Sequence, residues 1–182
     1  MRCSCYEIGG DVFSLAELEC RVLRGNTSPP SQIKPPYVEA PKKSKFYLDY
    51  ALEFVDPKIN FVINNAISPS NPTTIPIYTP LYLEKQMIHV CRLNLRTQLQ
   101  IDVKKRLIVL PKVCEIYIND FGGKGENNSV SCLLFCLQFL DEERQSIIID
   151  LISDDNGTPA IKYQHSNDSF YSFLKKDLTV WV

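Results

Sequence analysis

The stretch that decides the fold runs from Pro80 to Gln100, PLYLEKQMIHVCRLNLRTQLQ, and is soon followed by Arg106–Leu110, RLIVL. In the first part, apolar residues recur every four positions along one side: Leu83, Met87, Cys91 and Leu95. That spacing, with polar residues on the opposite side, predicts a long amphipathic helix with one buried face. The second part follows the turn-like Asp102–Lys105 and predicts a short strand.

Further helices are predicted on the C-terminal side of this centre. Pro111 suits the first turn of a helix because it lacks an N–H, and the next apolar residues, Val113, Ile116 and Tyr117, would form its buried face. Asp120–Gly123 should end that helix. The remaining predicted elements are a helix capped by Ser129, a helix over Glu142–Ile152 and a strand over Ile161–Tyr163.

On the N-terminal side, Ser14 and Glu17 have the spacing of a capping box, which predicts the start of a helix. Its apolar residues are Leu15, Leu18, Val22 and Leu23, and Gly25 stands where a left-handed residue would end it. Residues 27–44 carry five prolines, a density that excludes helix and central strand and predicts an extended surface connection.

Two shorter elements are predicted before the central helix. Asp49–Phe54 should form a short helix, and Ile59–Ile63 should form a buried strand because its residues are apolar in succession. Helices and strands thus alternate irregularly, which favours an α+β fold over a doubly wound sheet. We expect residues 1–182 to form one domain, with a small mixed sheet packed by several helices.

Composition narrows the class of protein. The formal net charge is -1, so no basic excess points to nucleic acid or an anionic membrane as a partner. The apolar runs are too short to span a bilayer. The seven cysteines are odd in number and several stand in apolar stretches, which favours reduced core thiols and a cytoplasmic location over a disulfide framework.

Two groups of motifs stand out along the chain. The first is Tyr6–Gly10 with Ser14-Leu15, Leu18-Glu19 and Leu23-Arg24. The second begins at Asp56-Pro57 and continues with Ile59-Asn60-Phe61, Ser68-Pro69, Ile77–Pro80, Leu110-Pro111-Lys112 and Asp120-Phe121. In this order and spacing they resemble the family called domain of unknown function 547, and the resemblance is strong over residues 6–123 and weak over 124–182. It implies a remote likeness to papain-like and transglutaminase-like folds.

The chain departs from the family pattern at three places. Helices that precede the tyrosine in the family have no counterpart before Tyr6, so the resemblance implies an incomplete domain. The family's histidine after Glu19 is Cys20, and its small-residue stretch before the Ser-Pro pair is Asn64–Ile67. Each departure removes a contributor to the chemistry that the likeness to cysteine hydrolases would imply.

The motif residues are the candidates for a site. Glu19, Arg24 and Asp120 are charged residues among apolar ones, which indicates either a buried structural pair or the lining of a binding cleft. For a cysteine nucleophile, the candidate pairs are Cys20 or Cys5 with His165, because His89 and Cys91 would point about 200° apart on a helix. The other binding candidates are Asn64, Asn65 and Tyr78.

The sequence predicts neither a metal site nor a cofactor. Cys3-x-Cys5 and Cys132-x₃-Cys136 are isolated pairs, whereas structural zinc sites join two matching pairs on turns. Gly122–Gly125 lacks the ending of a phosphate-binding loop.

By resemblance, such domains accompany DEP or glutaredoxin domains in animal proteins and a leucine-zipper region in plant proteins. These accompanying domains imply intracellular signalling. We therefore expect a non-catalytic interaction or regulatory module whose partners are other protein domains. An apolar face over Leu15–Leu23, left uncovered, would serve such association. The alternative is a degenerate cysteine-hydrolase-like enzyme.

Overall fold

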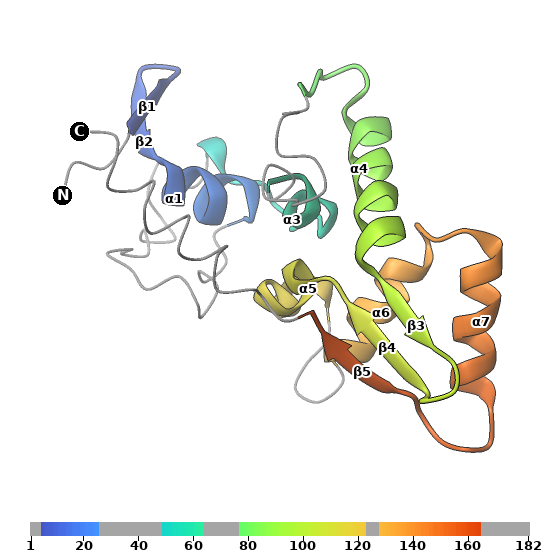
Figure 1. Ribbon diagram of the computed structural model, residues 1–182. Helices are drawn as coiled ribbons and strands as arrows, with labels where there is room; N and C mark the ends of the chain where they lie inside the picture. The colour runs from blue at the N-terminus through green and yellow to red at the C-terminus, as the bar shows by residue number, and fades with distance from the viewer. Residues whose placement is uncertain (1–4, 26–48, 64–76, 123–127, 165–182) are drawn as a thin grey trace, which may run out of the picture.

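The computed structural model describes residues 5–25, 49–63, 77–122 and 128–164 (Figure 1). The strands in these ranges are β1 (Cys5–Ile8), β2 (Asp11–Ser14), β3 (Gln100–Asp102), β4 (Leu107–Leu110) and β5 (Ala160–Tyr163). The helices in them are α1 (Leu15–Glu17), the π-helix η1 (Leu18–Leu23), α3 (Lys58–Ile63), α4 (Leu83–Gln98), α5 (Lys112–Ile116), the 3-10 helix η3 (Ile118–Phe121), α6 (Asn128–Leu137) and α7 (Glu142–Ser153).

The larger sheet is small and mixed, as predicted. Its order is β3-β4-β5, with β3 antiparallel and β5 parallel to the central β4. Ile108 of β4 pairs with Ile101 on one side and Ile161 on the other, so isoleucines line one face of the sheet. Along β4, buried residues alternate with half-buried ones, which is the pattern of a sheet with one face in the core. The α+β fold class is therefore confirmed.

The core lies where the long helix meets this sheet. Figure 1 shows α4 leading into β3 and α5 following directly from β4. Fully buried residues of α4 (Cys91, Leu95), α6 (Leu133) and α7 (Ile148) pack in one hydrophobic cluster with Ile108. The predicted face of α4 is present from Met87 onward. Leu83, however, is 41% exposed, because it stands one turn before the first buried residue.

A hairpin that the sequence did not predict opens the described chain. β1 and β2 pair antiparallel around Gly9-Gly10, whose φ angles of 63° and 89° suit the two-residue turns that a right-twisted hairpin requires. Phe13 of β2 is buried and lies edge-on to the ring of Tyr50, with ring centroids 5.3 Å apart.

The first helical segment follows this hairpin as predicted. Ser14 Oγ accepts a hydrogen bond from the Glu17 N–H, and the Glu17 carboxylate accepts one from the Ser14 N–H, which completes the capping box. From Leu18 the helix widens into the π-helical η1, which ends at Leu23 with Arg24 as its C-cap, and Gly25 follows with a left-handed φ of 55°.

The strand predicted over Ile59–Ile63 is wrong, because these residues belong to the helix α3. The Asp56 carboxylate accepts the Lys58 N–H at 3.0 Å, which begins the helix. Three successive residues of α3, Ile59, Asn60 and Phe61, are buried, and α3 packs along α4. A short helix buried on several sides has a continuous apolar run, which periodicity does not separate from a strand.

Three other boundaries need correction. Only Asp49 and Tyr50 of the expected helix over Asp49–Phe54 are helical. Ser129 lies inside α6 rather than capping it, and its hydroxyl is 2.6 Å from the Tyr163 hydroxyl. The long helix stops at Gln98, since Gln100 already pairs in the sheet. The proline-rich 27–44 lies outside the described residues.

Every helix in the described part of the chain falls short, in length or in apolar character, of what a membrane span requires.

Candidate functional site

A buried ion pair forms the centre of the site. Arg24 follows η1, and its guanidinium donates two hydrogen bonds to the carboxylate of Asp120 in η3, from Nε at 2.7 Å and from Nη2 at 2.8 Å. The Arg24 side chain is 3% exposed and that of Asp120 is 2% exposed. Such a two-pronged contact between a planar cation and a carboxylate is the strongest ion-pair geometry available to a protein.

A third element reaches the same carboxylate. Asn60 of α3 is fully buried, and its Nδ2 donates a hydrogen bond to Asp120 Oδ2 at 3.0 Å. Asp120 therefore receives donors from both Arg24 and Asn60, and η1, α3 and η3 are held around one side chain.

Tyr117 extends this network toward Glu19. The Arg24 guanidinium carbon lies 4.8 Å from the centre of the Tyr117 ring, a cation–π contact. The Tyr117 hydroxyl donates a hydrogen bond to Glu19 Oε1 at 2.7 Å. One aromatic side chain thus contacts the cation through its face and a second carboxylate through its hydroxyl.

Cys20 is the thiol of this network. Its Sγ lies 3.8 Å from Arg24 Nη1, and the residue is 1% exposed. Burial and the neighbouring Glu19 carboxylate raise the pKa of Cys20 to about 11, and the nearby Arg24 cation only partly offsets them. At neutral pH the side chain is therefore a protonated thiol, whereas nucleophilic attack requires a thiolate.

The structure brings together four of the residues that the sequence singled out, Glu19, Cys20, Arg24 and Asp120. Tyr78 lies elsewhere: burial, with the nearby Cys91 thiol, raises the pKa of its buried hydroxyl, for which no partner is found among the described residues. Asn64, Asn65 and His165 fall outside the described residues. His89 is exposed and Cys91 fully buried, so they point away from each other as predicted.

Sequence reasoning missed two members of the network. The sequence indicated Asn60 only as part of the family pattern and Tyr117 only as part of a buried helix face, because polar and amphipathic residues in short apolar runs have many ordinary roles. The one available signal was nearness in the sequence to other residues of the family pattern. Asn60 follows Asp56-Pro57 by three positions, and Tyr117 precedes Asp120 by three positions.

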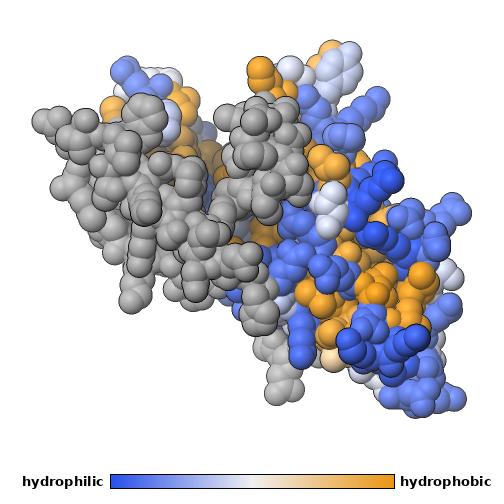
Figure 2. Space-filling model, in the orientation of Figure 1, coloured by the Kyte–Doolittle hydropathy of each residue, from blue (hydrophilic) through white to orange (hydrophobic). Residues whose placement is uncertain are grey.

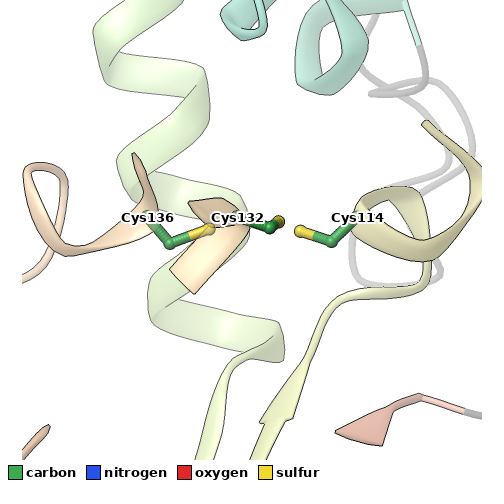
Figure 3. Close-up of side chains that lie close together, drawn as sticks. All are labelled: Cys114, Cys132 and Cys136. Atoms are coloured by element: carbon green, nitrogen blue, oxygen red, sulfur yellow. The ribbon is translucent and has the colours of Figure 1, made fainter. Parts of the chain in front are cut away.

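A second group of chemically active side chains lies in the core. Cys114 projects from α5 toward Cys132 and Cys136 of α6 (Figure 3). The three sulfur atoms lie within 4.8 Å of one another, and all three residues are 0% exposed. Hydrogen bonds from the other two thiols lower the pKa of Cys132, while burial raises that of Cys114 well above its usual value.

This thiol cluster, as we call Cys114, Cys132 and Cys136, was not predicted. The spacing of Cys132 and Cys136 was visible as one pair on a helix face. The third sulfur comes from another helix, and only the packing of α5 against α6 supplies it.

Two surface hollows lie away from the ion-pair network. The larger, about 500 Å³, is lined by Arg92, Arg96, Phe139, Leu140 and Asp141. The smaller, about 250 Å³, is lined by Val103, Ile147, Asp150, Leu151 and Asp154. Since no residue of the network lines either hollow, its charged groups do not open into these cavities.

Comparison with known proteins gives one match. The family model described as "Protein of unknown function, DUF547" matches residues 1–93, slightly more than half of the 182-residue chain. Searches of the curated proteins and of the solved structures gave no match. The matched part contains Glu19, Cys20, Arg24 and Asn60, and it ends before Tyr117 and Asp120; the extension of the resemblance to residue 123 stays a prediction. From the family match, the chain belongs to the DUF547 family of proteins of unknown function.

Proposed function

We propose that the chain is a non-catalytic interaction or regulatory module. The observation that carries the proposal is that the charged motif residues are buried and paired with each other: Arg24 and Asp120 neutralise each other, with side chains 3% and 2% exposed. A catalytic group must reach its substrate and have a pKa matched to its task. Groups that satisfy one another inside the protein instead hold its elements together.

The cysteine-hydrolase alternative depends on Cys20. Arg24 beside the thiol is the one feature in its favour, because a neighbouring cation stabilises a thiolate. Burial outweighs that cation and raises the pKa of Cys20 to about 11, which supports a structural thiol.

The partners we propose are other protein domains in the cytoplasm. Leu15 is 58% exposed and Leu23 is 38% exposed, one at each end of the first helical segment, which is the surface that the sequence predicted for association. Figure 2 shows further apolar side chains among polar ones over the sheet and α7. Five cysteines of the described helices and the segments beside them are free and buried, which agrees with a reducing compartment: Cys20, Cys91, Cys114, Cys132 and Cys136.

Alkylation of Cys20 tests the absence of catalysis. At pH 7.4, iodoacetamide should modify Cys20 of the native protein at least about 100-fold more slowly than in 8 M urea, because two pKa units lower the thiolate fraction about 100-fold. Peptide mass spectrometry measures the site and the rate, and Cys20→Ala identifies its signal. If native Cys20 reacts as fast as in urea, the enzyme alternative replaces the proposal.

Binding of an environment-sensitive dye tests the interaction surface. The native protein should bind the dye, and Leu15→Glu should lower that binding, whereas Lys105→Glu on the β3–β4 turn should not. If the protein sediments as a monomer and binds no dye, the proposed apolar surface is contradicted.

A further inference from the structure

We propose that Cys114, Cys132 and Cys136 form a binding site for a soft, closed-shell metal ion that prefers sulfur, either Cu(I) or Zn(II). The thiol cluster lies in the core, apart from the ion-pair network, and the geometry of its sulfur atoms carries the proposal (Figure 3).

The sulfur atoms are already near the spacing that a shared ion requires. Thiolates that bind zinc at about 2.3 Å from the metal stand about 4 Å from one another. The three atoms here lie within 4.8 Å of one another, so inward shifts of less than about 1 Å would close them on one ion. Side-chain rotation can supply shifts of that size while the helices stay in place.

Two elements hold the cluster in position. Cys132 and Cys136 are four residues apart on α6, so their side chains share one face of the helix. Cys114 is fixed from the other side because α5 begins directly after β4, the central strand of the sheet. The donors are thus partly preorganised by the fold.

Cys20 shows that burial alone does not gather thiols. It is also buried, at 1% exposure, yet the charged groups beside it are Glu19, Arg24 and Asp120, and among the described residues no other thiol acts on it. A cysteine that replaces a small apolar residue needs only carbon neighbours. Three sulfur atoms directed at one another, from two helices, are the arrangement of a ligand set.

The number and softness of the donors select the class of ion. Thiolates favour Cu(I) and Zn(II) over harder cations such as Mg²⁺ and Ca²⁺. Structural zinc takes four ligands almost without exception, and the cluster supplies three from the described residues. Cu(I) is stable with three sulfur ligands, so it fits the donor count more closely.

Binding must release protons and requires an opening. Each thiol that ligates the ion gives its proton to solvent, and its sulfur lone pair forms the bond to the metal with no change of oxidation state. Because all three residues are 0% exposed, the ion enters only when α5 or α6 moves away or while the chain folds. We therefore expect slow loading of the native protein and rapid loading during refolding.

The test uses the full chain, reduced and refolded under argon with either a buffered Cu(I) complex or Zn(II). We expect one ion per chain, and X-ray absorption should show sulfur neighbours at about 2.2–2.3 Å from the metal. A Cu(I) site with three sulfur neighbours would identify the ion as copper. A Zn(II) site with the three sulfurs and a fourth ligand would identify it as zinc. Failure to retain either ion after desalting overturns the proposal.

Variants locate the bound ion. Cys132→Ala and Cys114→Ala should each weaken binding at least about 100-fold, because loss of an outer-shell partner alone already costs about 10–100-fold and each of these variants removes a direct ligand. Cys20→Ala removes a buried thiol whose charged neighbours are Glu19, Arg24 and Asp120 rather than the cluster, and it should leave binding unchanged. If the ion stays bound in both cluster variants, or is lost only in Cys3→Ala, it binds elsewhere and the proposal is wrong. If a variant fails to fold, the X-ray absorption spectrum of the wild type, which counts the sulfur neighbours of the ion, still tests the proposal.

Discussion

Arg24 and Asp120 are 96 residues apart in the sequence and form a two-pronged ion pair inside the protein, with N–O distances of 2.7 and 2.8 Å. Arg24 lies within the part of the chain that matches the family, and Asp120 lies beyond it. The family match therefore ends before the residue that neutralises this buried cation, and the contacts of Arg24 extend past the matched residues to η3. This pair gives the first of four predictions.

Replacing Asp120 by asparagine should destabilise the protein by about 3–5 kcal/mol, because Arg24 is then left charged and uncompensated in the core. Urea unfolding followed by circular dichroism measures this loss. Asp102→Asn is the matched control, since the Asp102–Lys105 pair is exposed and should contribute less than about 1 kcal/mol. Equal effects of the two substitutions would mean that burial of the Arg24–Asp120 pair has no energetic consequence.

Tyr117 should contribute through two separable contacts. Tyr117→Phe removes the 2.7 Å hydrogen bond to Glu19 but keeps the ring over Arg24, so we expect a loss of about 1–2 kcal/mol. Tyr117→Leu also removes the cation–π contact and should cost about 0.5–2 kcal/mol more. Thermal unfolding of both variants checks the order, and a Phe variant as unstable as the Leu variant argues against a role for the ring.

The pH dependence of stability should reveal Cys20. Its pKa in the folded protein is raised to about 11 from 9.0, so its contribution is complete below pH 9 and disappears as the pH rises to about 11. Two units correspond to about 2–3 kcal/mol. The wild type should lose that much stability between pH 8.5 and 11.5 relative to Cys20→Ala.

The comparison with Cys20→Ala isolates one thiol from its surroundings. The groups that face Cys20 are Glu19 and Arg24 of the same segment, with Asp120 from η3. These groups, and Tyr117 beside them, are present in both proteins, so the comparison isolates the thiol. A difference in unfolding free energy that does not change with pH would show that the folded thiol has an ordinary pKa.

Gly25 should tolerate alanine less well than Gly122 does. Both have positive φ, 55° and 79°, so alanine strains the backbone at each by about 1–2 kcal/mol. At Gly25 the added Cβ would also stand 2.8 Å from the Leu52 carbonyl oxygen, while at Gly122 it meets nothing within 4 Å. We expect Gly25→Ala to cost at least about 1 kcal/mol more in chemical denaturation, and equal costs would exclude the close approach.

Local signals predicted many of the elements. The capping box at Ser14 and Glu17, the left-handed Gly25, the face of α4 and the strand β4 all follow from spacing within a few residues. The prediction was wrong at Ile59–Ile63, since a short helix packed on α4 is buried at successive positions and reads as a strand. The hairpin β1–β2 was missed because most of its residues are exposed and its apolar pattern is weak.

The site divides in the same way between sequence and structure. The sequence by itself determined the family and the residue types, including Glu19, Cys20 and Arg24 at helical spacing and two cysteines on one face of α6. Only the tertiary structure decided that Asp120 reaches Arg24 and that Cys114 completes the thiol cluster. The reason is physical: helical spacing is set by hydrogen bonds between near neighbours, whereas contacts between distant segments depend on how whole elements bury their apolar faces together.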